Sequence, residues 1–380
     1  MLNREKLSRE LFSRVSQLFP DLRNEDDLAR KIWNAISQDE AFSQRASAAQ
    51  SSFLVPTWQT NLNDTFAVPE INNGYIVVAV DGSQIYPDRH VSGAGCFLIN
   101  VGGITLSYGE SSNAILFNEP KVLLPDDVRI AHEEHFSRDL VDLLREEYEL
   151  LHSFKQALLL EDAVCLMDGT LIFWTLEGKS DAVKKFFLQR YLHHLDQFYQ
   201  NKILVAGYIS MPKSRELVNL IKLGLCRFTV ADCIACHKEY DEFPCKQVDH
   251  VLDTHVARYF LHENQRTTVF YSTSNIVESY PDHLKQAFVY MHVGSEIVRI
   301  EMPRWIAENK TYLDHVCAVA LDQSKKGNGY PVCLAEAHEQ AVVKGADREF
   351  FYHLLCKISM DKRQRLRFSP KSIKKRGIGV

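Results

Sequence analysis

The chain lacks any long hydrophobic run. No stretch approaches the roughly 20 consecutive apolar residues of a membrane-spanning helix, and residues 1–19 are amphipathic and charged, unlike a signal peptide. The nine cysteines are an odd number, which in a chain without such a leader predicts reduced thiols rather than a disulfide framework. These absences predict a cytoplasmic protein that does not contact a membrane.

The sequence also lacks low-complexity segments, internal repeats and a strong overall charge. Its 380 residues carry a formal net charge of -5, which does not indicate general affinity for nucleic acid. The exception is segment 359–380, where lysine and arginine far outnumber acidic residues. Such a basic C-terminal tail is either a solvated end or an arm that binds phosphate or a partner.

What is present divides the chain into segments. Residues 1–50 have apolar residues at helical spacing and predict an N-terminal helical extension, and residues 51–72 form a Ser-, Asn-, Thr- and Pro-rich connector. Residues 73–358 begin with strands and continue with alternating strands and helices, which predicts an α/β domain with a mixed β-sheet flanked by helices. Strands are expected at 76–80, 95–101, 103–107, 163–167, 203–209, 269–271, 287–292 and 297–302, and helices at 126–160, 183–198, from 214, at 330–343 and at 348–358.

Two apolar runs, within 75–83 and 163–170, end in Asp-Gly followed by a hydroxyl residue. Short apolar runs that glycine stops predict buried strands, and a carboxylate at the end of such a strand is costly to bury unless it is paired. Carboxylates brought together on adjacent strands are typical ligands of a hard divalent cation. Asp81 and Asp168 therefore predict a metal-dependent enzyme; the alternative is that each Asp-Gly is only a turn signal.

A third carboxylate interrupts an apolar helix stripe. Leu140, Leu144, Leu151 and Phe154 recur at helical spacing, and Glu147 occupies the missing position. A glutamate in such a seam must be ion-paired, protonated or bound to a metal. Glu147 is therefore either a metal ligand or one half of a salt bridge with arginine or lysine.

Other polar residues accompany the predicted strand ends and helices. His338 shares a helix face with Leu334 and is expected to face inward, either as a core residue or as a ligand. Lys213 and Arg215 follow the predicted strand 203–209 at a helix start, where they can cradle a phosphate. The alternative is that Ser214 simply caps the helix between exposed basic neighbours.

The cysteines gather in one segment that also contains a histidine. Cys233 and Cys236 form a C-x-x-C pair, with Cys226, His237 and Cys245 nearby. Two readings stay open: a structural zinc site at Cys233 and Cys236, or unpaired reduced thiols.

Five motifs, taken in order, resemble the NurA nucleases. They are Asp81-Gly82-Ser83, Met167-Asp168-Gly169-Thr170-Leu171, Gly207-Tyr208-Ile209-Ser210 with Lys213-Ser214-Arg215, Val298-Arg299-Ile300-Glu301-Met302-Pro303, and Gly329-Tyr330-Pro331 leading to Ala335-Glu336-Ala337-His338. The resemblance covers residues 70–355, with 226–280 poorly matched and insertion-like. It implies an RNase H-like core and a ring-like homodimer around a DNA channel. It also implies Mn²⁺ or Mg²⁺ as cofactor, activity as a 5′-to-3′ exonuclease and single-strand endonuclease, and a HerA-type hexameric translocase as partner.

The resemblance also implies a site. Its catalytic residues would be Asp81, Asp168, Tyr208, His338 and a helix glutamate, taken as Glu147 from the seam argument, with Glu146 and Glu149 as alternatives. Asp81, Glu147, Asp168 and His338 would bind one or two metal ions, Tyr208 would position the scissile phosphate, and Lys213 or Arg215 would balance its charge.

Competing interpretations are a phosphatase and an inactive adaptor. Asp168-Gly169-Thr170 echoes the aspartyl-phosphatase signature D-x-D-G-T, but Leu166 stands where that signature requires aspartate. A catalytically inactive DNA-binding subunit of a HerA-type translocase is the alternative outside enzymes. The sequence does not separate a role in DNA end resection and repair from one in anti-phage defence.

Overall fold

The computed structural model describes residues 2–71, 74–87, 91–92, 95–110, 112–128, 130, 137–362 and 367–368. Most of the basic tail 359–380 lies outside these residues. The helices of eight or more residues are α1 Arg4–Ser13, α3 Arg23–Ser37, α5 Arg138–Ala157, α6 Asp181–Gln200, α7 Glu216–Gly224, α12 Lys310–Lys326, α13 Val332–Ala341 and α14 Gly345–Asp361. Shorter helices are α2 Val15–Leu18, α4 Phe42–Ala48, η1 Pro125–Asp127, η2 Trp174–Leu176, α8 Cys233–Glu239, η3 Pro244–Val248, α9 Asp253–Ala257, α10 Asn275–Glu278, η4 Asp282–Leu284 and α11 Arg304–Ala307.

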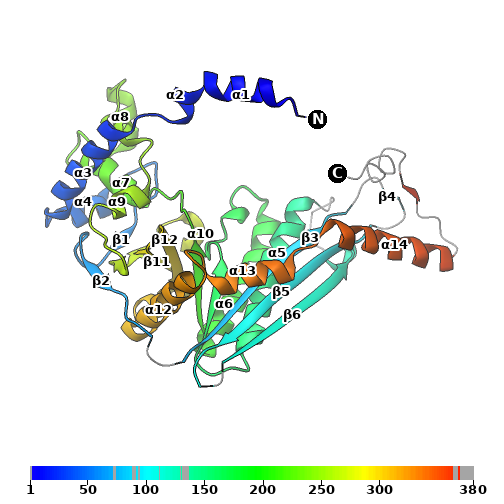
Figure 1. The fold of residues 1–380 in the computed structure, drawn as a ribbon. Coiled ribbons are helices and arrows are strands. Elements are labelled where there is room, and N and C mark those ends of the chain that lie inside the picture. Colours follow the sequence, from blue (N-terminus) through cyan, green and yellow to red (C-terminus); the bar gives the residue numbers. More distant parts are fainter. Residues whose placement is uncertain are drawn as a thin grey trace.

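A large mixed sheet runs through the molecule (Figure 1). Its strand order is β1-β10-β11-β12-β8-β7-β3-β5-β6, with β9 and β2 attached beside β11. Strands β3, β7 and β8 are parallel, and their other neighbours pair antiparallel. The strands are β1 Thr57–Trp58, β2 Thr65–Ala67, β3 Ile76–Ile85, β5 Phe97–Ser107, β6 Asn113–Leu123, β7 Ala163–Asp168, β8 Leu204–Ile209, β9 Gln265–Thr267, β10 Phe270–Tyr271, β11 Gln286–His292 and β12 Ile297–Pro303, and β4 Val91–Ser92 pairs separately with β13 Arg367–Phe368. The predicted α/β class with a mixed sheet flanked by helices is confirmed.

Helices cover both faces of the central strands. In β3, Gly82 faces α5, whereas the next residue, Ser83, donates a hydrogen bond to the carbonyl of Ala341 at the end of α13. Because successive strand residues point to opposite faces, α5 and α13 lie on opposite sides of the sheet. Helix α6 packs beside α5, and α12 packs beside α13. The central strands are therefore buried on both faces, which accounts for their nearly continuous apolar runs.

Strand β5 corrects an expectation. The sequence predicts two strands separated by glycines, but β5 is one strand that runs through Gly102 and Gly103 and pairs along its whole length with β3. A Cβ at Gly102 would collide with the backbone of Gln340 and Ala341. These glycines therefore do not make a turn; Gly102 allows α13 to lie directly on the sheet.

Strand β6 was not predicted from the sequence. Its residues are largely exposed, so that it has little apolar alternation, and Pro120 lies within it. Proline is tolerated on an edge strand, and β6 is the edge of the sheet beyond β5.

The N-terminal helices belong to a second hydrophobic core. Trp33 of α3 is fully buried, stacks on Phe260 and belongs to the same buried cluster as Leu217 of α7 and Val256 of α9. The predicted connector 51–72 contributes β1 and β2 to the sheet. The extension, the connector and the segment after β8 thus pack together.

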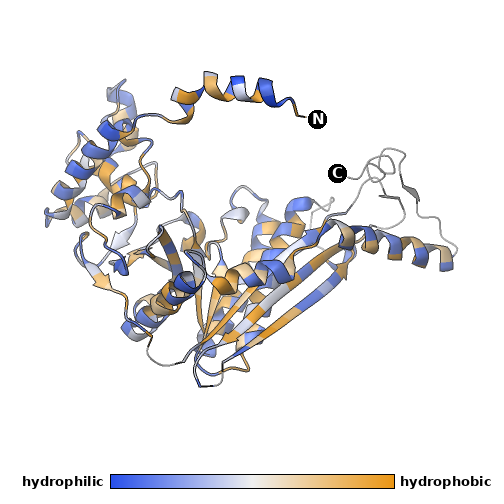
Figure 2. Ribbon diagram, in the orientation of Figure 1, coloured by the Kyte–Doolittle hydropathy of each residue, from blue (hydrophilic) through white to orange (hydrophobic). Residues whose placement is uncertain are grey.

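Helices α1 and α2 differ from the others. They project from the rest of the chain, and Figure 2 shows apolar residues along them. Neither helix buries a side chain among the described residues. No helix in the described part of the chain is long and apolar enough to cross a membrane.

Candidate active site

Asp81 and Asp168 lie next to each other in neighbouring parallel strands. Val80 of β3 is in register with Met167 of β7, so that the following residues, Asp81 and Asp168, point to the same face. Oδ2 of Asp81 lies 2.7 Å from Nδ1 of His338, and the carboxylate of Asp168 is hydrogen-bonded to the hydroxyl of Tyr330. Burial and the charge of Asp81 raise the pKa of Asp168. Adjacent strands therefore bring together the two predicted aspartates.

Gly82 admits α5 to this site from the opposite face of the sheet. A Cβ at this position would lie 2.6 Å from Oε1 of Glu149 and 2.7 Å from Cγ of Arg145. The glycine of the Asp-Gly-Ser motif therefore has a steric role, because a side chain would push the side chains of Arg145 and Glu149 aside.

Glu149 completes a carboxylate cluster around a cavity of about 220 Å³. Asp81, Glu146, Glu149 and Asp168 line this carboxylate cavity together with Arg145. Burial raises the pKa of Glu149 to about 8, and the charges of Asp81 and Glu146 add to the shift although the ion pair with Arg145 opposes it. Negative charge is thus concentrated where little water is available to solvate it.

Glu147, predicted as the helix ligand, has a different environment. Its side chain is buried and faces α6, where Nη2 of Arg190 lies 2.7 Å from Oε1 and Nε2 of His194 lies 3.4 Å from the same atom. It does not line the carboxylate cavity. Glu147 thus has the environment of the salt-bridge alternative, and Glu149 and Glu146 are the glutamates that lie beside the aspartates.

Tyr208 does not reach the carboxylate cavity either. Its ring is fully buried, and its hydroxyl lies 3.0 Å from Oγ of Ser324 in α12. The ring of Tyr330 packs edge-on against it at a centroid distance of 5.8 Å and supplies the hydroxyl that contacts Asp168. The phenol at the site is thus Tyr330, whose position just before α13 in Gly329-Tyr330-Pro331 was the available signal.

His338 lies beside Asp81 but does not face inward as expected. Its side chain is 59% exposed, because the buried face of α13 is formed by Cys333, Leu334, Ala337 and Ala341. The imidazole therefore sits at the rim of the site, in contact with both Asp81 and solvent.

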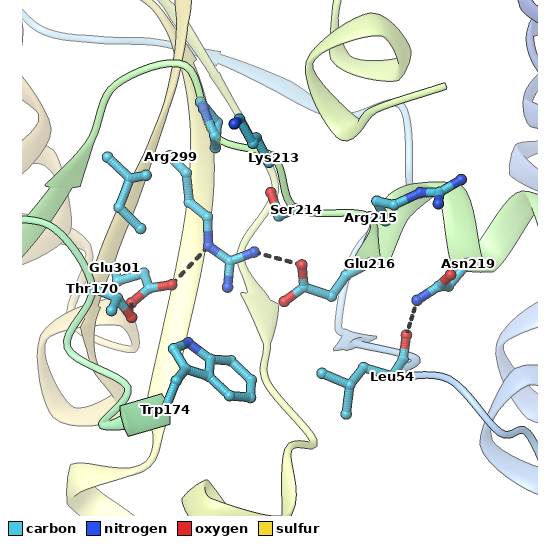
Figure 3. Close-up of a pocket in the computed structure, with 12 residues that line it drawn as sticks. Leu54, Thr170, Trp174, Lys213, Ser214, Arg215, Glu216, Asn219, Arg299 and Glu301 are labelled. Atoms are coloured by element: carbon cyan, nitrogen blue, oxygen red, sulfur yellow. Dashed lines mark hydrogen bonds and ion pairs between the residues drawn. The ribbon is translucent and has the colours of Figure 1, made fainter. Parts of the chain in front are cut away.

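A second cavity of about 430 Å³, the Arg299 pocket, adjoins the first. Arg299 is buried in it between two carboxylates: Nε donates to Glu301 at 2.8 Å and Nη1 donates to Glu216 at 2.8 Å (Figure 3). Oε2 of Glu301 accepts hydrogen bonds from Oγ1 of Thr170 and from the backbone N–H of Leu171. Glu301 therefore anchors the loop that follows Asp168.

The two predicted phosphate-binding residues behave differently. Lys213 lines the Arg299 pocket, is exposed and has no hydrogen-bond or ion-pair partner among the described residues. Arg215 points away from Arg299 in Figure 3 and donates to the carbonyl oxygens of Val248 and Asp249. Helix α7 begins at Glu216 with Arg215 as its N-cap residue, so that Ser214 is not the cap.

The possible metal ligands are of the right kind for a hard cation. Three carboxylates, from Asp81, Glu149 and Asp168, offer the oxygen donors that Mn²⁺ and Mg²⁺ prefer. Each is now engaged by His338, Arg145 or Tyr330, and within the described residues no three His, Cys, Asp or Glu side chains are arranged to hold a metal. Cys233 and Cys236 likewise belong to no such group among the described residues, and their thiols are free.

Fold and site together define a class: an α/β protein in which aspartates of adjacent parallel strands meet glutamates of a covering helix. The model of the NurA domain family matches residues 75–343, and the chain belongs to the NurA family. The structure is similar to the crystal structure of the NurA nuclease from Sulfolobus solfataricus, with a TM-score of 0.54 and 14% identity, covering 95% of this chain and 98% of that one. No curated protein sequence matches the chain.

Proposed function

We propose that the protein is a metal-dependent DNA nuclease that hydrolyses phosphodiester bonds as a 5′-to-3′ exonuclease and single-strand endonuclease. The observation that carries the proposal is the convergence of Asp81, Asp168 and Glu149 on one cavity in a chain of the NurA family. The biological setting would be DNA end resection and repair or anti-phage defence, since both need the same chemistry.

Asp81, Asp168 and Glu149 would hold one or two Mn²⁺ or Mg²⁺ ions, with Glu146 as a further oxygen donor. Such an ion, when bound, activates water as the nucleophile and offsets charge on the leaving oxygen. Binding would replace the present contacts of the carboxylates with Arg145, Tyr330 and His338. Burial, together with the charge of the neighbouring Asp81, raises the pKa values of Asp168 and Glu149, and a bound cation would offset both effects.

The remaining side chains have roles that follow from their positions. His338 is exposed and touches Asp81, so that it can accept a proton at the site and release it to solvent. In the absence of an ion, Tyr330 orients Asp168 through its hydrogen bond. Lys213 is placed to neutralise a phosphate of the bound strand.

We propose a homodimer and a HerA-type hexameric translocase as the assembly partners. Apolar side chains are exposed on three elements: Leu11 and Phe12 on α1, Ile115 on β6, and Phe350 and Ile358 on α14. Exposed apolar side chains that recur on one element are typical of interaction sites, and these three elements could serve more than one partner.

The deciding experiment measures degradation of 5′- and 3′-labelled single- and double-stranded DNA with Mn²⁺, Mg²⁺ or EDTA, with and without a HerA-type translocase. Asp81→Asn should lower the rate by at least about 100-fold, because it removes a charged metal ligand. Asp139→Asn, an exposed aspartate on the first turn of α5, is the matched control. Mn²⁺ should also raise the unfolding temperature of the wild type and not of Asp81→Asn.

Undiminished cutting by Asp81→Asn would show that the metal assignment is wrong. DNA binding without cutting under every condition, translocase included, would support the inactive adaptor instead.

A further inference from the structure

We propose that the Arg299 pocket binds one unpaired nucleotide of a DNA strand, with its base stacked on Trp174 and its phosphate at Lys213. The inference rests on the proposed function and extends it, because it assigns the site for the nucleotide that neighbours the scissile phosphate. Of the residues that line this pocket, the catalytic assignment uses only Lys213.

The pocket shares part of its wall with the carboxylate cavity. Thr170 and Trp174 line both cavities, and Thr170 follows Asp168 by two residues. A strand whose phosphate lies at Asp81 and Asp168 therefore has its next nucleotide at the wall that carries Trp174.

Trp174 presents an aromatic surface at this junction. It begins the short helix η2, which is held by the backbone hydrogen bond from its own N–H to the carbonyl of Ile172 at 2.7 Å and by the fully buried Leu176. The indole itself is only half-buried. A half-buried indole on a fixed turn is suited to stack on a base. Such stacking does not depend on which of the four bases is bound.

The charge balance of the pocket favours a phosphate at Lys213. The charge of Arg299 is neutralised by Glu216 and Glu301, and its Nη1 also lies 3.3 Å from the hydroxyl of Tyr290. Arg299 therefore forms part of the pocket wall and does not supply a free charge for a phosphate. Asn219 donates its amide to the carbonyl of Leu54. Among the described residues that line the pocket, Lys213 is the cation without a hydrogen-bond or ion-pair partner. In Figure 3 it lies on the opposite side of Arg299 from Trp174.

The size of the pocket indicates a single base rather than a duplex. Its volume of about 430 Å³ lies in the range of small-ligand sites. A base that enters such a pocket has left its pairing partner. The pocket therefore favours single-stranded ends.

The test measures binding, in EDTA, of full-length Asp81→Asn protein to two fluorescein-labelled single strands: oligo-dT and an oligomer of the same length made of abasic residues. Adding Trp174→Ala should weaken oligo-dT binding by at least about fivefold and leave abasic binding unchanged, because only a base can stack. Trp174→Phe should restore the preference for oligo-dT. Lys213→Ala should weaken both oligomers equally and reduce the dependence of binding on salt by about one phosphate contact.

Trp58→Phe and Lys31→Ala are the matched controls, since both residues lie outside the two cavities. Equal loss on both oligomers for Trp174→Ala, or no loss on either, would overturn the inference. Hydrolysis by the wild type with Mn²⁺ is measured separately. Trp174-dependent binding without hydrolysis would refute the proposed function alone, and hydrolysis without a Trp174 effect would refute this inference alone.

Discussion

Glu147 and Glu149 stand two positions apart on α5 and have opposite pKa shifts. Burial alone would raise the pKa of Glu147, but hydrogen bonds from His194 and Arg190 lower it overall. Burial and neighbouring carboxylates raise the pKa of Glu149 to about 8. The charged form is thus stabilised at Glu147 and penalised at Glu149, which agrees with our proposal that Glu149, and not Glu147, binds the cation.

Replacing each glutamate by glutamine should separate these roles. Glu147→Gln should lower the free energy of unfolding by about 1–3 kcal/mol, because Arg190 and His194 lose a charged partner, and should leave the turnover rate near that of the wild type. Glu149→Gln should lower the rate by at least about 100-fold with little loss of stability. Urea unfolding and DNA hydrolysis, measured on both variants, check the contrast; the reverse pattern would restore Glu147 as the ligand.

Asp253 supplies a pH dependence away from the site. It is buried at the start of α9, where it accepts hydrogen bonds from the backbone N–H of Val218 and the hydroxyl of Tyr290. Burial and the charge of Glu216 raise its pKa, although Arg299 opposes the shift. The folded state therefore binds this proton more tightly than the unfolded state does.

The contribution of Asp253 to stability is complete below its unfolded pKa, near 4, and is lost as the pH rises through the raised folded value. We expect the free energy of unfolding of the wild type, relative to that of Asp253→Asn, to fall between pH 4 and pH 8. Urea unfolding of both proteins at several pH values measures the difference. A difference that is constant with pH, or that grows, would contradict the assignment.

Some residues of the candidate site can be predicted from the sequence and others cannot. Asp81 and Asp168 were predictable because each ends an apolar strand, and paired strand ends meet at one place. The choice among Glu146, Glu147 and Glu149 was not, because it depends on how α5 is rotated against Gly82. The resemblance implies Tyr208, and its position along a strand does not reveal that its hydroxyl contacts Ser324 whereas that of Tyr330 contacts Asp168.

At the scale of elements, α13 lies so close to β5 that Gly102 has no room for a side chain. Gly102→Ala should lower the free energy of unfolding by about 1–3 kcal/mol, since helix backbone must move to accommodate the methyl group. The same movement should carry His338 away from Asp81 and reduce the hydrolysis rate. Thermal unfolding and kinetics check both effects.

Gly345→Ala is the control, because a Cβ at that position would meet no atom within 4 Å. A Gly102→Ala variant as stable and active as this control would show that the contact is not restrictive. The example also explains the error about β5: glycine in a sequence signals a turn more often than a close approach, and only the packing of α13 distinguishes the two. Strand β6 escaped prediction because its exposed residues carry no alternation that would mark it.

At the scale of the whole molecule, α1 and α2 stand apart from both hydrophobic cores. Leu7, Leu11, Val15 and Leu18 form an apolar stripe that is exposed along both helices. The helical spacing of these four residues can be read from the sequence. The sequence cannot show that no other described part of the chain covers them.

Deleting residues 2–19 should leave the unfolding temperature and the hydrolysis rate unchanged, because the described residues of this segment bury no side chain. It should abolish binding to a HerA-type translocase, because we propose that the exposed apolar stripe on α1 and α2 is the docking surface for that partner. Differential scanning fluorimetry and sedimentation with the translocase measure the two effects. A fall in unfolding temperature, or a dimer that becomes a monomer, would place the stripe in the protein's own fold or self-association.

The contact between Asp81 and His338 joins residues 257 positions apart in the chain. During synthesis on the ribosome, the aspartate emerges long before the histidine, and α13 reaches the sheet only after almost the whole domain has been translated. A nascent or prematurely terminated chain therefore carries acidic strand ends without their rim histidine or Tyr330. For the DNA nuclease that we propose, this order of assembly would delay activity until α13 has docked.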